Sequence, residues 1–373
     1  MDISSSGMTL DRIATEESLA RLAEPWDRLS ECADAPNVFM TYAWFHPWYR
    51  ALANEDTAAQ RQLCVVTCGR DGQIQALCPL VFRTVARGGF TIRKLEFLGG
   101  HADYNDLLLG VRSADTYSQL AAFLDQTQDE WDLVDLRDLR DLGPSLQLIQ
   151  AALARCGLQY QLLPEPDRYV YLRIDASWQE MLGRMSHNGR QMLRKKQRRL
   201  GRAGLAVRIV EDPRQEPDVL PKLAAIEKQK QVGGAASEPL VAAYLEVFQS
   251  LFDTLGPRGW LYLALMEDAG RLVAWRLGFR CGRSLWDYST AYDRSYAELS
   301  PGTMLIPAIL DYGFSHGYTE HDFLRGAEPY KLRWSDEYHP TYRLLIWSRR
   351  WRSRFRKLVY FDLKSHLYRW LGR

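Results

Sequence analysis

The segment LWDYSTAYDRSYAELSPGTMLIPAILDYGFSHG, residues 285–317, combines a strand, a polar loop and a helix with one apolar face. The strand ends near Asp293, and proline suits the first turn of the helix because its missing N–H would be unpaired there anyway. A glycine lets the backbone approach a ligand closely, and the free N–H groups of a first turn attract phosphate. The segment therefore predicts a phosphate site at Ser300, Pro301, Gly302 and Thr303; the alternative is an ordinary strand-to-helix turn.

A second polar segment, HDFLRGAEPYKLRW, follows a short predicted strand at residues 321–334. Loops at strand ends in α/β folds often carry function. The Tyr330 hydroxyl and the Lys331 ammonium can donate hydrogen bonds to an oxyanion or to a phosphate. Asp322 is either a buried strand-end carboxylate or a general base. The alternative is a solvated loop with an aromatic anchor.

The order of predicted elements is repeated in the two halves of the chain. The first half has helices, then a hairpin with an Asp71-Gly72 turn, then a β-α-β-α-β run. Pro164 and Pro166 mark a boundary, after which the second half begins with a strand and a helix that is capped by Ser177. This repetition without obvious sequence identity indicates a duplicated α/β module.

The composition fits an ordinary globular protein: 46% of the 373 residues are hydrophobic, 25% are charged, and the net charge is +2. The six cysteines show no CxxC pair and no zinc spacing, so we expect reduced thiols and no metal. The N-terminus lacks the pattern of a signal peptide, and no apolar run approaches the ~18 residues that span a bilayer. These features predict a cytoplasmic protein of two domains.

The chain resembles the cellulose-biosynthesis-protein-like branch of the Gcn5-related (GNAT) acyltransferase superfamily. The two segments that carry the resemblance are STAYDRSYAELSPGTML and HDFLRGAEPYKLRW. This branch is similar to the Fem-type aminoacyltransferases, which build peptidoglycan interpeptide bridges. LGGHADYNDLLL, WDLVDLRDL and the basic helix near residue 190 agree with the resemblance. The resemblance covers most of residues 10–347.

The resemblance implies an α/β (α+β) fold with two tandem acyltransferase modules, each a mixed, mainly antiparallel sheet flanked by helices. We expect the modules at residues 1–165 and 166–348, followed by a basic aromatic tail at 349–373. In this fold a splayed pair of strands admits the thioester, here 284–293 and 318–324. The coenzyme A pyrophosphate would then lie on the helix that begins near Pro301. One departure is that the superfamily's usual glycine-rich loop is reduced here to Ser-Pro-Gly.

General chemistry assigns roles to the remaining polar side chains. An amine acceptor must be deprotonated, and the base is predicted to be Asp293 or Asp322. A strand N–H and, by resemblance, Lys331 would stabilise the oxyanion. The candidates for the acid that protonates the leaving group are Tyr288, Tyr292 and Tyr330. By resemblance, Asp103 and Asp106 face the acceptor between the modules, and the predicted substrate-binding residues are Asp103, Tyr104, Asp106, Arg190, Lys196, Tyr292 and Arg325. The alternative for the two aspartates is a structural turn.

The segment SHNGRQMLRKKQRRLGRAG, residues 186–204, has seven basic residues and no acidic one. At the helical period of ~100° per residue its apolar side chains form one stripe, which predicts a helix docked on a core. A break at His187–Gly189 would place Arg190 in the first turn of a new helix, next to a bound phosphate. The alternatives are a solvated basic face or a seat for an anionic sugar-nucleotide, lipid-linked phosphate or tRNA. No DNA-binding motif surrounds the helix, so we do not expect DNA binding.

The C-terminal segment, residues 349–373, contains nine Arg/Lys and one Asp, so the rest of the chain sums to −6. Its mixture of cations and aromatic residues suits an anionic membrane surface. Docking of the tail on the second module is the alternative interpretation.

Together these observations predict an acyl-CoA-dependent N-acyltransferase of a cell-envelope or exopolysaccharide precursor, with a coenzyme A thioester as co-substrate. We place it in the cytoplasm, with a peripheral contact to the inner face of the membrane through its tail. The first alternative is an aminoacyl-tRNA-dependent ligase of the Fem type, and no coiled-coil insertion for tRNA is visible. The second is a non-catalytic partner of a polysaccharide synthase.

Overall fold

The computed structural model describes residues 8–32, 36–53, 61–87, 90–98, 102–141, 143–231, 238–351 and 353. The chain divides into two compact units. The first comprises Met1–Phe45, Leu52–Pro166 and Pro340–Arg373, and the second comprises His46–Ala51 and Asp167–His339. Each unit has its own mixed sheet flanked by helices, so the predicted α/β (α+β) class is confirmed.

The described strands of the first unit are β1 (Met8–Ile13), β2 (Arg61–Arg70), β3 (Gln73–Arg87), β4 (Phe90–Phe97), β5 (Leu109–Gly110), β6 (Leu133–Arg140), β7 (Gln159–Pro164) and β15 (Thr341–Trp347). Its helices are α1 (Glu16–Arg21), α2 (Ala23–Glu31), a 3₁₀ turn η1 (Val38–Met40), α4 (Ala114–Gln126) and α5 (Ser145–Arg155), while α3 (Tyr42–Ala53) is divided between the units.

The sheet of the first unit has the order β1-β2-β3-β4-β6-β15-β7, and β5 pairs with β3. The predicted hairpin is confirmed: Asp71 and Gly72 join β2 to β3 with φ angles of 52° and 76°. Positive φ at both central residues is the requirement of a type I′ turn, which Asp-Gly meets readily. Side chains of α4 and α5 complete the core on one face, among them Tyr117, Leu120 and Ile149.

The last strand corrects the module limits expected from the sequence. Residues 341–348 were assigned to the second module, but β15 pairs with β6 on one side and with β7 on the other. Both neighbours need β15 to satisfy the backbone N–H and C=O groups on their inner edges. The second unit is therefore inserted into the first, between β7 and β15.

The described strands of the second unit are β8 (Tyr169–Arg173), β9 (Leu205–Val210), β10 (Leu261–Asp268), β11 (Arg271–Cys281), β12 (Ser284–Tyr292), β13 (Glu320–Arg325) and β14 (Tyr338–His339). Its helices are α6 (Trp178–Arg184), α7 (His187–Arg202), α8 (Val219–Gln231), α9 (Glu238–Leu255), α10 (Pro301–Met304) and α11 (Ile306–Ser315), with 3₁₀ turns η3 (Pro213–Gln215) and η4 (Arg294–Leu299).

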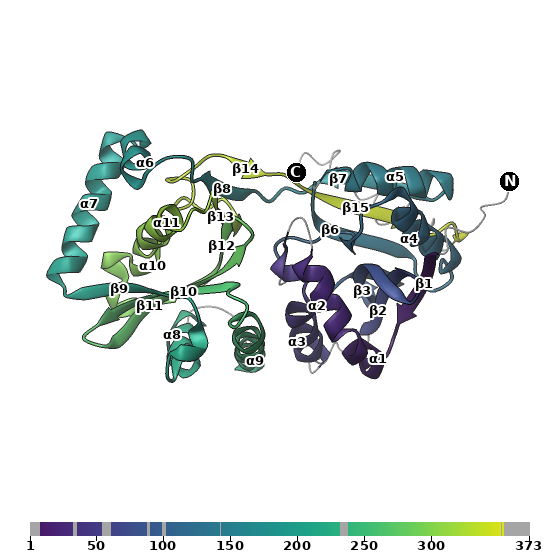
Figure 1. Ribbon diagram of the computed structural model, residues 1–373, viewed down its shortest axis with the longest axis horizontal. Helices are drawn as coiled ribbons and strands as arrows, with labels where there is room; N and C mark the ends of the chain where they lie inside the picture. Colours follow the sequence, from purple (N-terminus) through teal and green to yellow (C-terminus); the bar gives the residue numbers. More distant parts are fainter. Residues whose placement is uncertain are drawn as a thin grey trace. The chain divides into compact units, whose positions relative to one another are not determined.

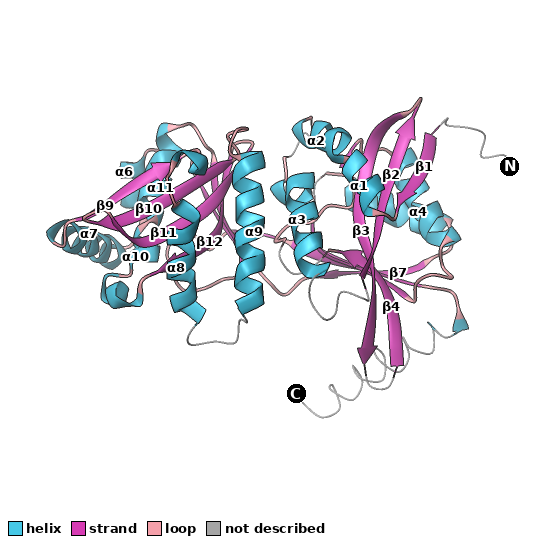
Figure 2. Ribbon diagram, turned by 90° about the horizontal axis from the view of Figure 1, so that it is seen from below, coloured by secondary structure: helices cyan, strands magenta, loops and turns pink. Residues whose placement is uncertain are grey.

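The sheet of the second unit has the order β14-β8-β13-β12-β11-β10-β9 and is covered by helices on both faces. Figure 1 shows α6, α7, α10 and α11 above this sheet and α8 and α9 below it. In Figure 2, α8 and α9 run side by side across the lower face. The upper core joins Leu193 and Leu200 of α7 to Met304 and Ile309 of α10 and α11. Leu193 and Leu200 of the predicted apolar stripe are thus buried, whereas Met192 of the same stripe is 40% exposed.

The described start of the tail lies against the first unit rather than the second. Arg349 pairs with Asp125, Arg350 lies 3.2 Å from Asp129, and Ser353 donates to the Asp132 carbonyl at 2.5 Å. Docking of these residues on the second module is therefore wrong. Most of the predicted membrane-contacting tail lies outside the described residues. In the part of the chain that the structure describes, we find no helix with the length and hydropathy needed to cross a bilayer.

Candidate active site

β12 and β13 of the second unit are paired in parallel only where they begin. The register joins Ser284, Leu285 and Trp286 to Glu320, His321 and Asp322, and among the described residues it ends there. Beyond this point β12 remains paired with β11, whereas β13 pairs with β8. Tyr288 has no counterpart on β11, which is a β-bulge at the place where the two parallel strands part. The strand ends therefore form a V of the kind that the sequence resemblance implied.

The first unit has the same parallel pairing, but its own chain fills the space beyond it. β4 and β6 pair only over Lys94–Glu96 and Leu133–Asp135. Asn105 then bridges to Leu139: its N–H donates to the Asp138 carbonyl at 2.9 Å, and its amide donates to the Arg137 carbonyl at 3.1 Å. These bonds satisfy the backbone of β6 internally. We therefore look for the acyl-donor site in the second unit.

A buried ion pair lies at the base of the V in the second unit. Arg276 of β11 and Asp287 of β12 are 2% and 6% exposed, and their side chains are in direct contact. The second guanidinium nitrogen of Arg276 donates to the Gly302 carbonyl at 3.0 Å. Burial acts to raise the pKa of Asp287, but the Arg276 charge together with the neighbouring His321 and Lys331 outweighs burial and holds that pKa below its ordinary value. The pair therefore ties the two central strands to the start of α10.

Two further polar side chains border this pair. His321 of β13 is fully buried, and its Nε2 lies 3.8 Å from the Asp287 carboxylate. Neither ring nitrogen of His321 has a hydrogen-bond partner among the described residues. The Tyr330 ring lies 5.7 Å from the Arg276 guanidinium carbon. Burial and the Asp287 charge raise the pKa of Tyr330 to about 12, so its hydroxyl keeps its proton at neutral pH.

Lys331 lies beside this group, but its ammonium is engaged by the backbone. The side chain is 4% exposed and donates to the carbonyls of Leu324, Arg325 and Gly326. Glu328 lies 3.0 Å from the same nitrogen. An ammonium has three protons, so none remains for an oxyanion. The predicted oxyanion role of Lys331 is replaced by a structural one, which is to hold the turn after β13.

The two carboxylates predicted as general bases have different environments. Asp293 accepts from the Ser295 N–H and hydroxyl at the start of η4 and pairs with Arg271. Burial acts to raise the pKa of Asp293, but these contacts hold it below its ordinary value. Asp293 is therefore a capping residue with low basicity. Asp322 is fully buried and accepts from the Leu324 N–H at 2.8 Å.

The predicted phosphate segment lies under a cluster of cations. Ser300 has a left-handed backbone with φ of 53°, and its hydroxyl accepts from the Lys196 ammonium of α7 at 2.9 Å. Burial first, and then the positive charges of Arg333 and Arg199, lower the pKa of Lys196. The N–H groups of Gly302 and Thr303 lie in the first turn and have no acceptor within the helix. Like charges that gather beside free N–H groups form a favourable place for an anion.

Gly302 has a packing role that the sequence did not indicate. A Cβ atom at this position would lie 3.3 Å from the Thr290 hydroxyl and 3.5 Å from the Tyr292 ring. The helix start is therefore seated closely on β12. The helix predicted to begin near Pro301 is divided at Leu305 into α10 and α11.

Arg190 differs from Lys196, although both were predicted to bind an anion. The break expected at His187–Gly189 occurs at Met185–Ser186, and Arg190 folds back over it. Its guanidinium donates to the carbonyls of Leu182, Gly183 and Met185 at 3.3, 2.6 and 2.7 Å. These are the free carbonyls at the end of α6, so Arg190 is a helix cap rather than an anion ligand.

We expect Arg190→Ala to lower the free energy of unfolding by about 1–2 kcal/mol, because it removes hydrogen bonds to three carbonyls. Urea unfolding measures this loss. Arg194→Ala, on the same helix but exposed, is the control and should change stability little. A raised donor KM in Arg190→Ala at unchanged stability would restore the anion-binding role.

The substrate residues predicted in the first unit are largely buried. Tyr104 is fully buried, and Asp106 is 3% exposed with its carboxylate 2.5 Å from Arg112. Burial raises the pKa of Asp106, although the Arg112 charge opposes this rise. Asp103 is half-buried on the same segment. Burial therefore favours the structural alternative for Asp106 and makes Tyr104 a core residue, because buried side chains do not present themselves to an acceptor.

The other predicted residues occupy different parts of the second unit. Tyr288 lies at the bulge with its ring 5.4 Å from that of Phe279. Tyr292 is 40% exposed at the end of β12. The Arg325 guanidinium lies 5.9 Å from the Tyr169 ring. The structure thus brings Tyr330, Lys331 and Asp322 to the V, and brings Lys196 to the predicted phosphate segment.

One group of described residues has the composition of a metal site. Oxygen and nitrogen atoms of Glu320, Asp322 and His339 lie within 4.8 Å of one another. His339 Nε2 is 3.1 Å from the Glu320 carboxylate, which also accepts from the Ser284 hydroxyl. These contacts account for Glu320 and His339 as a hydrogen-bonded pair, and we assign no metal to the group.

Arg276, Asp287 and His321 were missed by the sequence analysis. The available signal was a charged residue inside an apolar strand, as in LVAWRLGF and SLWDYS. Buried charges are rare and paired, so such positions point to a buried network. No sequence rule, however, would have joined residues 276, 287 and 321, because they meet only through the pairing of three strands.

The comparisons with known proteins agree with this geometry. A family model of the acetyltransferase (GNAT) domain matches residues 187–332, which is less than half of the chain but includes β12, β13, Lys196 and Arg199. The search of curated proteins gave no match.

Two solved structures share the fold over most of the chain. A crystal structure of FemX is 12% identical with a TM-score of 0.54, and the match covers 89% of this chain and 96% of that one. The C-terminal domain of a putative lysylphosphatidylglycerol synthetase from Agrobacterium fabrum is 12% identical with a TM-score of 0.53, covering 88% and 92%. At these identities the likeness concerns the fold alone. Residues 187–332 therefore match the acetyltransferase (GNAT) domain, and the fold of the chain is similar to that of FemX.

Proposed function

We propose that this protein is an acyl-CoA-dependent N-acyltransferase whose donor binds to the second unit and whose acceptor is an amine of a cell-envelope or exopolysaccharide precursor. The observation that carries the donor assignment is the contact of Lys196 with Ser300 beside the free N–H groups of α10, with Arg333 and Arg199 near enough to lower the pKa of Lys196. A pyrophosphate there would neutralise three like charges and accept from free N–H groups. The acyl arm would then enter the V between β12 and β13.

The proposed reaction forms a C–N bond and breaks a C–S bond. The deprotonated amine attacks the thioester carbonyl carbon, and a backbone N–H of β12 stabilises the oxyanion. When the intermediate collapses, coenzyme A leaves as a thiolate and takes a proton from Tyr330. Asp322 remains the candidate base, since Asp293 serves as a cap.

We expect Lys196→Ala to raise the Kd for acetyl-CoA roughly tenfold, because a charge-assisted bond to phosphate is lost. The adjacent Lys195→Ala is the matched control: this side chain points outward and should leave the Kd unchanged. Thermal-shift titration with acetyl-CoA and longer acyl-CoAs measures both values, because a bound ligand stabilises by mass action. Equal Kd values in wild type and Lys196→Ala would remove the donor site from this position.

An activity assay with a purified amine-bearing saccharide precursor tests the reaction itself. The proposal is supported if acyl transfer from acetyl-CoA continues after treatment with ribonuclease. Transfer that needs aminoacyl-tRNA and is lost with ribonuclease would replace it with a ligase of the Fem type.

A further inference from the structure

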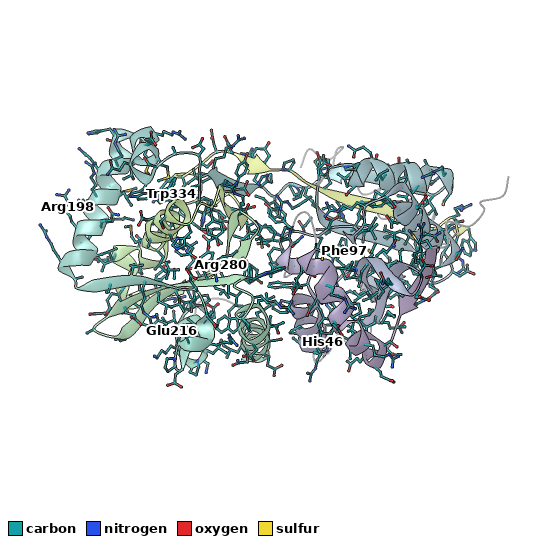
Figure 3. The ribbon with its side chains drawn as sticks, viewed as in Figure 1. His46, Phe97, Arg198, Glu216, Arg280 and Trp334 are labelled. Carbon is teal, nitrogen blue, oxygen red and sulfur yellow. The ribbon has the colours of Figure 1, made fainter. Side chains whose placement is uncertain are left out.

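The outward face of α7 carries positive charge that a coenzyme A at the proposed donor site does not use. Gln191, Lys195, Arg198 and Arg202 lie opposite the buried Leu193 and Leu200 at the helical period, with Arg194 on one side. All five are exposed, and Figure 3 shows Arg198 pointing away from the body of the unit. The helix has no acidic residue.

This stripe and the proposed donor site lie on opposite sides of one helix. Lys196 faces inward to the Ser300 hydroxyl, whereas its neighbour Lys195 faces solvent. A helix with its side chains is about 10 Å across, so phosphates held at Ser300 do not contact Lys195, Arg198 or Arg202. The outward charges therefore suit something larger than the cofactor.

The surrounding surface restricts what that larger partner can be. α7 holds seven of the 24 Lys/Arg of residues 167–339, and the rest of that segment has 17 Lys/Arg and 22 Asp/Glu, a net charge of −5. A nucleic acid, with its wide and uniformly negative footprint, would gain little from a unit whose charge outside α7 is net negative. Leu193 and Leu200 of α7 are buried in the core, and Met192 is the one exposed apolar side chain of the helix at 40%, so α7 has no continuous apolar face to insert into a lipid surface. A small acidic protein surface that covers one helix face fits the charge best.

We propose that α7 docks a small acidic carrier protein, which delivers the acyl group on a phosphopantetheine arm to the same V. This inference rests on the proposed function and names its donor: the arm has the same thioester, pantetheine and phosphate as acyl-CoA. Lys196 on the inner side receives the phosphate, while Lys195, Arg198 and Arg202 hold the carrier by its acidic side chains. Such charges act mainly by steering the encounter and fixing its register.

The experiment compares acetyl-CoA with an acetylated acyl-carrier protein as donor for wild type and for Lys195→Glu/Arg198→Glu. We expect the double variant to raise the KM for the carrier donor at least roughly tenfold, because like charges then face each other. The KM for acetyl-CoA should stay within about twofold, since the inner cations are intact. The matched control is Lys222→Glu/Lys228→Glu on α8, which makes the same charge change on the opposite face of the sheet and should alter neither KM.

The outcomes separate this inference from the proposed function. The carrier proposal is contradicted if the enzyme is active with acetyl-CoA but not with the carrier donor. It is also contradicted if the α7 variant leaves the KM for the carrier donor unchanged. Neither result contradicts the proposed acyltransferase function. No activity with either donor contradicts the function itself. A third outcome is that the wild type binds tRNA or anionic phospholipid vesicles, and that the α7 variant abolishes this binding without changing the kinetics with the carrier donor. The stripe would then be assigned to that polyanion instead. The carrier proposal is supported if the KM of the wild type for the carrier donor rises with salt concentration, and if the α7 variant raises the KM for the carrier donor but not the KM for acetyl-CoA.

Discussion

Asp287→Asn should lower the free energy of unfolding by about 3–5 kcal/mol, which is a large fraction of the stability of a typical domain. The substitution leaves the Arg276 guanidinium buried without its carboxylate partner. Removing one member of a buried pair costs far more than replacing both with apolar groups. Urea unfolding monitored by circular dichroism measures the loss.

The same substitution should weaken donor binding. Arg276 also donates to the Gly302 carbonyl, so a shifted guanidinium moves the start of α10 away from β12. We expect the Kd for acetyl-CoA to rise roughly tenfold in Asp287→Asn, the equivalent of one charge-assisted bond. Arg276→Met/Asp287→Leu serves as the comparison: it should regain much of the stability but not the affinity, because it lacks the bond to Gly302.

Acid should act on the wild type through the same carboxylate. The folded-state pKa of Asp287 is lowered, so its contribution to stability is present above the unfolded value of about 3.9 and is lost as pH falls through the folded value. Asp287→Asn lacks this titrating carboxylate, so its free energy of unfolding should fall less steeply below about pH 4 than that of the wild type. Equal stability of Asp287→Asn and wild type at neutral pH would contradict the role of the pair.

The fold was accessible from the sequence because its evidence is local and periodic. The Asp71-Gly72 turn, the Ser177 cap with Glu180 and the buried leucines of α7 each depend on residues within a few positions. The start of α10 at Pro301 follows from the rule for proline in a first turn. Such signals remain valid whatever the rest of the chain does.

The candidate site was less accessible because its contacts join distant segments. Lys196 meets Ser300 across 104 positions, which no sequence pattern encodes. Arg190 has the same charge and lies on the same helix, yet it folds back onto the end of α6. The sequence could not separate these two roles, since the geometry of the preceding helix decides which cation is free.

The strand β15 shows the same limit at the level of topology. Its hydrophobic pattern predicts a strand, but the choice between two sheets depends on which edges are open. β6 and β7 provide that opening in the first unit, although residues 167–339 separate β7 from β15 in the chain. Chain order alone therefore placed residues 341–348 in the wrong unit.

Lys331→Met should lower both the free energy of unfolding and the enzymatic activity. The relative size of the two losses distinguishes a structural lysine from a catalytic one. The ammonium bonds to three consecutive carbonyls, and this turn contains Leu324 at φ 56° and Gly326 at φ 103°. Leucine in the left-handed region costs of order 1 kcal/mol, which the surrounding contacts must offset. Loss of the ammonium leaves the three carbonyls unsatisfied, so we expect about 3 kcal/mol less unfolding free energy.

The size and kind of the kinetic defect distinguish the two roles. If Lys331 supported the oxyanion, Lys331→Met would lower kcat by roughly 10²–10³ with stability unchanged, as removal of an oxyanion donor does. A structural lysine predicts instead that kcat falls with the folded fraction and that osmolytes which favour the compact state restore part of it. Leu332→Ala, adjacent and 44% exposed, is the control and should affect neither quantity. A large loss of kcat at unchanged stability would show that Lys331 takes part in the reaction. The turn after β13 would then have to release the Lys331 ammonium when substrate binds, so that it can reach the oxyanion.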